Sequence, residues 1–141
     1  MAHGIDTTAV RGDLVADYDA ICRVVQLCTD GEATGDVAKL TEAFHADVRM
    51  FGSLAGVRYD VPIAELFALA ASAPADTGSY LSRILSVQQT GDAALAVVAE
   101  EGYWGTVSFT DYFQLARIDG TWKIVSKLFV HTGGEPPDFG A

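Results

Sequence analysis

Four consecutive strand-like segments fill the C-terminal half of the chain and constrain its fold more than any other feature. Each is rich in β-branched and aromatic residues. The segments are separated by Gly-Asp, Tyr-Trp-Gly and Asp-Gly, which are typical of hairpin turns. They predict an antiparallel meander of long strands, which must twist and bend, with Gly102 and Gly105 as the expected bending points. The segments cover residues 79–92, 93–105, 106–120 and 121–132.

Helical patterns precede the meander. Apolar residues spaced four and three apart predict an amphipathic helix over residues 13–30, which a segment with two glycines should end. An aspartate that can act as N-cap opens a second, shorter helix over residues 36–46. Asp60 can cap a third helix over residues 60–74, with Pro62 in the first turn, where its missing N–H costs little.

Helices followed by an antiparallel meander are typical of the α+β class. Residues 47–53 predict a short strand, and residues 56–60 predict either another strand or a loop. We expect three helices packed in the concave face of a strongly curved, mainly antiparallel sheet, which gives a cone with an internal cavity. The 141 residues suit one domain, expected over residues 13–132 between tails at 1–12 and 133–141.

The charge balance bears on partners and location. Nineteen acidic residues against nine Lys and Arg give a formal net charge of -10. Such a field repels phosphate backbones and anionic lipids, so neither nucleic acid nor a membrane surface is expected as a partner. We find no signal-peptide pattern and no apolar run of about 18 residues, and we expect a cytoplasmic protein.

The inventory of reactive residues predicts no metal and no cofactor. His3, His45 and His131 lack metal-ligand spacing. Cys22 and Cys28 lie six positions apart, which separates them by roughly 120° on a helix, so we expect two buried thiols. The sequence also has no nucleophile elbow, phosphate-binding loop or dinucleotide fingerprint.

Three ionisable residues interrupt the apolar closing hairpin. Because side chains alternate along a strand, Asp111 and Phe113 share one face of the first strand. Lys127, Phe129 and His131 share one face of the second strand. We expect Asp111 and Lys127 either to form a partly buried ion pair that only replaces lost water, or to grip or react with a ligand.

Three segments resemble the nuclear transport factor 2-like superfamily, whose fold is a cone, over residues 13–132. They are LTEAFHADVRMFG, ILSVQQTGDAALAVV and FTDYFQLARIDGTWKIVSK. The last is similar to the signature of the group called putative lumazine-binding, which we take together with the SnoaL-like proteins. The resemblance implies that Asp111 and Lys127 look into the cone and that the outer sheet face pairs two subunits.

The resemblance therefore implies a pocket with aromatic walls and a polar floor. One residue of the pair Glu100 and Glu101, and one of the pair Tyr103 and Trp104, should face it, because neighbours alternate. Such walls suit a planar or ring-containing molecule. The predicted lining consists of Phe51, Phe67, Asp111, Phe113, Lys127, Phe129 and His131.

The same alternation predicts a homodimer. The face opposite Lys127 carries an apolar stripe that would be an aggregation hazard in water, so we expect a second copy of the chain to cover it. The stripe consists of Trp122, Ile124, Leu128 and Val130.

Two functions remain open at this level, and a third is weaker. The first is a module that holds a mostly apolar, ring-containing ligand without turnover. The second is a cofactor-free isomerase, dehydratase or polyketide-cyclase-like enzyme that transfers protons with Asp111 and either His131 or Lys127. Ketosteroid isomerase activity itself is not expected, because its base would fall near Gly52 and its Tyr near Cys28. The third is an interaction domain with a filled cone.

Overall fold

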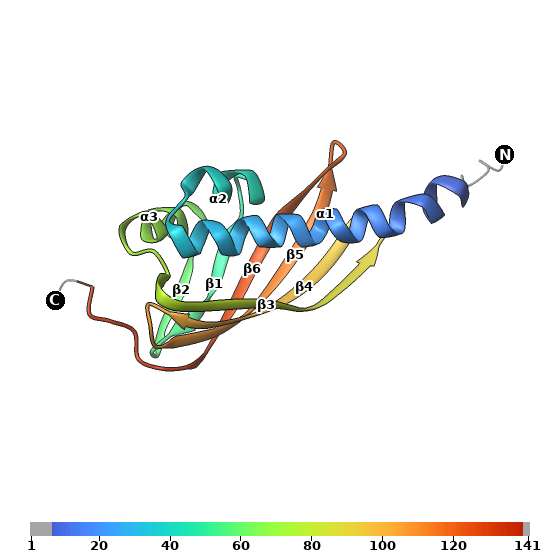
Figure 1. Cartoon of the computed structure of the whole chain (residues 1–141). Helices are drawn as coiled ribbons and strands as arrows, with labels where there is room; N and C mark the ends of the chain where they lie inside the picture. The colour runs from blue at the N-terminus through green and yellow to red at the C-terminus, as the bar shows by residue number, and fades with distance from the viewer. Residues whose placement is uncertain (1–6, 140–141) are drawn as a thin grey trace.

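The computed structural model describes residues 7–139, with side chains from residue 14 onward. Its helices and strands follow the predicted order (Figure 1). The elements are α1 (Thr7–Thr34), α2 (Val37–Ala43), β1 (Arg49–Leu54), β2 (Val57–Pro62), α3 (Ala64–Ser72), β3 (Asp76–Thr90), β4 (Ala93–Tyr103), β5 (Val107–Ile118) and β6 (Thr121–Gly133).

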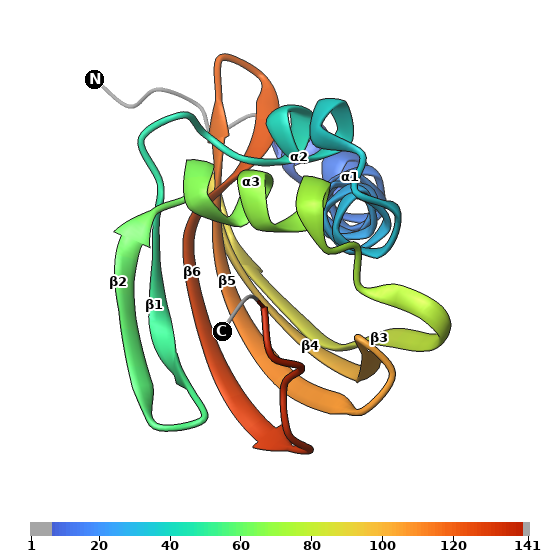
Figure 2. The same cartoon turned by 90° about the vertical axis from the view of Figure 1, so that its left-hand side faces the viewer.

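The six strands form one sheet in the order β2-β1-β6-β5-β4-β3. All neighbours are antiparallel except β1 and β6, which run parallel. The sheet curves strongly, and the helices lie on its concave side (Figure 2). The predicted α+β class, with helices in the concave face of a mainly antiparallel sheet, is confirmed.

Helix α1 is longer than predicted at both ends. It begins at Thr7, inside the segment predicted as a tail, and it continues through Gly31 to Thr34. A Cβ at Gly31 would lie 2.7 Å from the Leu40 side chain, so this glycine lets α2 pack closely against α1. Gly35, with a φ of 74°, takes the left-handed conformation that ends helices.

Helix α2 is capped as the sequence predicts, and α3 is not. The Asp36 side chain accepts a hydrogen bond from the Lys39 backbone N–H at 3.2 Å. Asp60 instead lies within β2, where its carboxylate accepts a hydrogen bond from Arg49 Nε at 3.0 Å. Pro62 ends β2, at the sheet edge where a missing N–H is tolerated, so α3 starts only at Ala64.

A β-bulge in β6 overturns the predicted apolar stripe. The β5–β6 register shifts at Val125, which leaves one extra residue on β6 and reverses the alternation of faces. Trp122 and Ile124 consequently point inward and are buried, at 4% and 0% exposure. Leu128 and Val130 lie on the opposite, convex face at 43% and 47% exposure. The four residues do not share a face.

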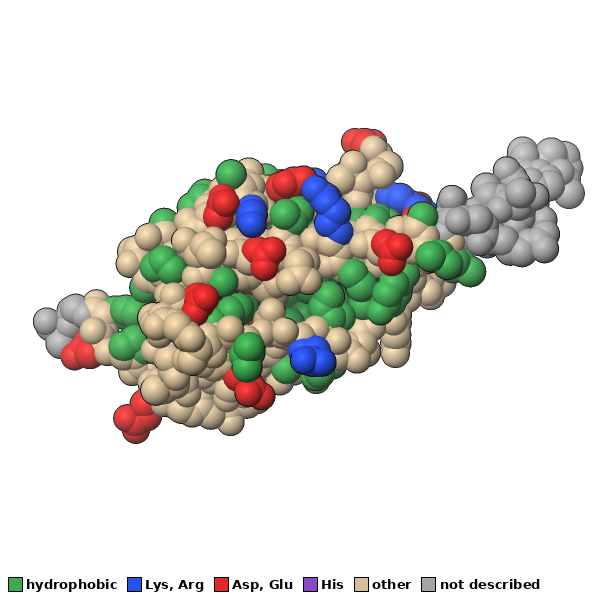
Figure 3. All heavy atoms as spheres, viewed as in Figure 1, with side chains coloured by type: hydrophobic (Ala, Val, Ile, Leu, Met, Phe, Trp, Pro, Cys, Tyr) green, Lys and Arg blue, Asp and Glu red, His purple; other side chains and the backbone are tan. Residues whose placement is uncertain are grey.

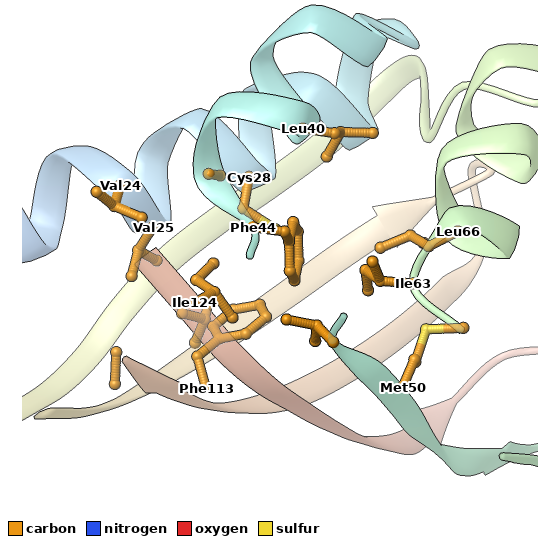
Figure 4. Packing of buried hydrophobic residues seen from close by; sticks show 14 of the residues in the cluster. Val24, Val25, Cys28, Leu40, Phe44, Met50, Ile63, Leu66, Phe113 and Ile124 are labelled. Atoms are coloured by element: carbon orange, nitrogen blue, oxygen red, sulfur yellow. The ribbon is translucent and has the colours of Figure 1, made fainter. Parts of the chain in front are cut away.

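The hydrophobic core joins the helices to the sheet. Val25 and Cys28 of α1 and Leu40 of α2 lie above the strands that carry Phe113 and Ile124 (Figure 4). Rings from different elements continue this packing, because Phe44 contacts Phe67 and Phe113 at centroid distances of 5.8 and 6.3 Å. This part of the cone is filled by side chains.

A helix that crosses a membrane needs about 20 consecutive, mostly apolar residues. Within the described residues, no helix combines the length and apolarity needed to cross one. Acidic and basic side chains are dispersed over the face shown in Figure 3.

Candidate functional site

A narrow pocket opens beside the filled core, between α1, α3 and the concave face of the sheet. Its cavity volume is about 50 Å³, and the wider hollow that includes solvent at its mouth measures about 430 Å³. Its deep wall carries four ionisable side chains from four different elements. These are Glu32 of α1, Glu100 of β4, Asp111 of β5 and Lys127 of β6. All four are buried.

Lys127 is held between two carboxylates. Its Nζ lies 3.1 Å from Glu32 Oε1 and 3.9 Å from Asp111 Oδ2. Strand register explains the second contact, because Asp111 lies opposite Phe129 and Lys127 opposite Phe113 on one face of the hairpin. Burial alone would lower the pKa of Lys127, but these carboxylates outweigh it and raise that pKa, so the side chain is an ammonium.

Glu32 is the site residue that sequence reasoning missed. Its carboxylate accepts hydrogen bonds from Lys127 Nζ at 3.1 Å, from Tyr103 OH at 3.0 Å and from Cys28 Sγ at 3.4 Å. A signal was available, because Glu32 continues the four-and-three spacing of the first helix one step beyond Cys28. Gly31 suggested that the helix ends before this position, so the predicted helix did not include Glu32.

Glu100 faces the pocket and Glu101 faces solvent, as alternation requires. Tyr80 donates a hydrogen bond to Glu100 Oε2 at 2.6 Å. Burial raises the pKa of Glu100 well above its usual range, and the charges of Asp111 and Glu32 raise it further. The raised pKa favours the protonated form of Glu100 beside the Asp111 carboxylate.

Asp111 is the least satisfied member of the group. Its side chain is 1% exposed, and neither carboxylate oxygen receives a hydrogen bond from the described residues. Buried carboxylates ordinarily accept several hydrogen bonds, so this one has unused acceptor capacity inside the pocket.

The carboxyl groups do not form a convincing metal site. One oxygen from each of Glu32, Glu100 and Asp111 lies within 4.8 Å of the others, a spacing that would suit a divalent cation. The Lys127 ammonium, however, already contacts two of the three, so a metal ion bound by all three would have to displace it. The three carboxyl groups therefore suit the buried Lys127 ammonium better than a metal ion.

Aromatic rings form the remaining walls. Tyr103 contacts Trp104 and Phe109 at centroid distances of 4.6 and 5.1 Å, and Phe109 contacts Phe129 at 5.7 Å. Tyr59 extends the row at 6.2 Å from Phe129, and all five line the pocket. Tyr103 and Trp104 were expected to face opposite sides, but the strand ends at Tyr103 and Trp104 turns back with a φ of 54°.

Three of the four phenylalanines predicted to line the pocket lie elsewhere. Phe51 is 44% exposed on the convex face, where it pairs with Leu128 of β6. Phe67 packs against Phe44 in the core. Phe113 is fully buried beneath Lys127, with the ammonium 5.7 Å from its ring centre. Asp111, Lys127 and Phe129 are the predicted residues that line the pocket.

His131 serves the backbone and not the pocket. Its Nδ1 accepts a hydrogen bond from the Ala55 N–H at 3.1 Å, so the proton resides on Nε2, which donates to the carbonyl oxygens of Gly133 and Gly134. These bonds join the β1–β2 turn to the end of β6. His131 is not among the residues that line the pocket described above.

Gly52 marks the position where a ketosteroid isomerase would carry its base. A Cβ there would lie 2.4 Å from the Phe129 carbonyl oxygen and 2.7 Å from its ring. The space for such a side chain is therefore filled by Phe129. Cys28, at the corresponding tyrosine position, donates to Glu32, and burial raises the pKa of its thiol well above the usual range.

Comparisons with known proteins agree with this architecture. Among curated proteins, "Aldolase FrzH" of Cladobotryum sp is 27% identical over 115 residues, which cover 81% of this chain and 90% of the relative. A nuclear transport factor 2-like protein from Shewanella baltica OS155 superposes with a TM-score of 0.78 at 26% identity, covering 86% of this chain and 98% of the other. Another nuclear transport factor 2-like protein, from Methylobacillus flagellatus KT, superposes with a TM-score of 0.76 at 30% identity, covering 84% of this chain and 94% of the other.

The family profile described as putative lumazine-binding matches residues 16–130, which include every pocket residue discussed above. The chain therefore belongs to the putative lumazine-binding family of the nuclear transport factor 2-like superfamily.

Proposed function

We propose that the pocket binds a small, flat, mostly apolar molecule that carries a carbonyl group, and that its polar floor moves a proton on that molecule without a cofactor. The observation that carries this proposal is Asp111, a buried carboxylate with unused acceptor capacity at the pocket wall. A passive apolar pocket has no need of such a group, since burying an incompletely paired charge costs free energy.

Each polar residue then has a role. Asp111 removes a proton from the carbon next to the carbonyl, and the C–H electron pair moves into the carbon skeleton to leave negative charge on the carbonyl oxygen. The Lys127 ammonium donates a hydrogen bond to that oxygen. The proton held by Asp111 returns to another carbon or to a newly formed alkoxide. Glu100, whose raised pKa favours its protonated form, is the second acid of the pair.

Lys127 is not proposed as a nucleophile. A lysine that forms a Schiff base must be a neutral amine, which requires a lowered pKa. The neighbouring carboxylates of Asp111 and Glu32 raise the pKa of Lys127 instead. Its proposed contribution is therefore electrostatic.

The similarity to a curated aldolase supports the same reaction class, because aldol addition also begins with removal of a proton next to a carbonyl. The second candidate is ligand binding without turnover. It is favoured by Phe129, which fills the space beside Gly52 where the related isomerases would carry a base. The family description points to binding as well.

Deuterium exchange separates the two candidates. The protein is incubated in D₂O with small ring ketones such as 2-indanone and cyclohexanone, and deuterium at the carbon next to the carbonyl is followed by NMR. We expect catalysed exchange that falls by about 10²–10⁴-fold in Asp111→Asn, the usual contribution of a general base. Asp92→Asn, on an exposed turn, is the control. Ketone binding without exchange above buffer would favour the binding module.

We further propose that two copies of the chain pair through the convex face of the sheet. The residues of this interface differ from the stripe predicted from the sequence, because Trp122 and Ile124 point inward. Leu128 lies directly opposite Tyr112 on one side and Phe51 on the other, and Val130 follows on the same face. All four are large apolar side chains at 40–47% exposure. A continuous apolar patch across neighbouring strands is typical of an interface.

A further inference from the structure

The charge balance of the pocket floor favours one chemical class of ligand. The floor brings together three carboxyl groups and a single ammonium, whose Nζ lies 3.1 Å from Glu32 and 3.9 Å from Asp111, so acidic groups outnumber basic ones. We propose that the ligand supplies the missing positive charge and is a small ring-containing amine bound as its ammonium ion. This inference depends on the proposed ligand pocket but not on the proposed proton transfer.

An anionic ligand would find no free cation. Within the described residues, the pocket is lined by one basic side chain, Lys127, and its charge is already offset by Glu32 at 3.1 Å and Asp111 at 3.9 Å. Its remaining N–H groups can donate to a carbonyl oxygen, but its single charge cannot balance a further anion as well. A bound carboxylate or phosphate would have to compete with both of these acids in a low-dielectric cavity. The arrangement therefore disfavours anions.

A cationic N–H donor, in contrast, would satisfy Asp111. Neither of its oxygens receives a hydrogen bond from the described residues, and the side chain is almost completely buried. A ligand ammonium would give one oxygen of this carboxylate a charge-assisted hydrogen bond and a balancing charge, and it would leave the other oxygen available as the base. A neutral hydroxyl group could donate a hydrogen bond but would leave the charge unbalanced.

The walls of the pocket favour the same class. Tyr59, Tyr103, Trp104, Phe109 and Phe129 form a connected row of rings around the cavity. Ring faces attract cations, most strongly when water is excluded. An acid beside an aromatic wall suits an organic ammonium, and the chain's net charge of -10 would also attract such cations from solution.

Three probes with the same ring and different charges test the proposal. Benzylamine is a cation at neutral pH, benzyl alcohol is neutral and benzoate is an anion. Their affinities for the full chain are measured by titration calorimetry at low and high salt. We expect benzylamine to bind at least about tenfold more tightly than benzyl alcohol, and benzoate to bind most weakly. The preference should persist at high salt because a buried pair is poorly screened.

Two variants test whether Asp111 causes the preference for benzylamine over benzyl alcohol. Asp111→Asn should reduce the benzylamine advantage to within about threefold, whereas Asp92→Asn should retain it. If Asp111→Asn does not fold, Trp104→Leu is used, and it should weaken benzylamine more than benzyl alcohol. Equal or tighter binding of benzoate, loss of the preference at high salt, or no binding of any probe would overturn the proposal. Absence of deuterium exchange would remove only the proton-transfer function.

Discussion

The Lys127 ammonium lies 3.1 Å from Glu32 and 3.9 Å from Asp111, so one buried charge links helix α1 to strands β5 and β6. We predict that Lys127→Met lowers the free energy of unfolding by about 3–5 kcal/mol, because it leaves buried carboxylates without their counterion. Urea unfolding followed by circular dichroism measures the loss.

Lys39→Met is the matched control, since Lys39 lies on α2 away from the pocket, and it should change stability by less than about 0.5 kcal/mol. The double variant Lys127→Met/Glu32→Gln should recover part of the loss. Equal stability of the Lys127 and Lys39 variants would show that the buried ion pair contributes nothing.

The raised pKa of Glu100 predicts how the free energy of unfolding depends on pH. Its pKa is raised in the folded protein, so the folded state keeps a proton that the unfolded chain loses above its ordinary value of 4.5. The free energy of unfolding therefore falls as pH rises through this window, by about 1.4 kcal/mol per pH unit for one proton. Lys127, with its raised pKa, keeps its stabilising charge below 10.5 and adds no slope here.

Glu100→Gln removes the ionisation while keeping the shape of the protonated acid. We expect the variant to gain stability relative to the native chain as pH rises from about 5 to about 8, in urea unfolding at each pH. Glu101→Gln, the exposed neighbour, should show the native slope. A native slope in the Glu100 variant would mean that Glu100 is ionised in the folded protein.

A second polar cluster fastens the other end of α1. Asp17 accepts hydrogen bonds from Arg117 at 2.7 Å and from Gln89 at 2.8 Å, and Arg117 also lies over the Trp122 ring. Burial would raise the pKa of Asp17, but the bonds from Gln89 and Arg117 outweigh it and lower that pKa. Its contribution is therefore present above pH 3.8 and is lost as pH falls through the lowered value.

Asp17→Asn should lower the melting temperature at neutral pH by a few °C, on the order of one lost charge-assisted contact. Asp92→Asn is the comparison, because Asp92 also contacts Arg117 but its side chain is 74% exposed, and its effect should be smaller. The melting temperatures of the Asp17→Asn and Asp92→Asn variants should become equal in strong acid. A larger effect for Asp92 would contradict the assignment of Asp17 as the anchor.

The bulge at Val125 gives the proposed dimer a sharp test. Leu128→Glu combined with Val130→Glu should convert dimers into folded monomers on a sizing column, because both side chains lie on the convex face. Ile124→Glu should instead prevent folding, since Ile124 is fully buried and a carboxylate there has no partner. An unchanged elution volume for the double variant would move the interface elsewhere.

Local sequence signals predicted most of the elements. Asp119-Gly120 forms the two-residue turn that its composition predicts, with a positive φ at both residues. Asp36 caps the second helix. Alternation along β5 and β6 brought Asp111 and Lys127 to one face, because the pleat repeats every two residues and no irregularity falls between Lys127 and Phe129.

The tertiary structure decided what depends on contacts between distant residues. A sequence read with strict alternation assigns Ile124 and Leu128 to one face, and only the pairing with β5 reveals the extra residue at Val125 that separates them. Gly31 signals a helix end locally, yet close packing against Leu40 keeps it helical and brings Glu32 to Lys127. Helix period, turn chemistry and capping act within a few residues, so the sequence alone determines them. Which charge meets which across the cone depends on register and packing over nearly a hundred positions, and only the folded chain determines those.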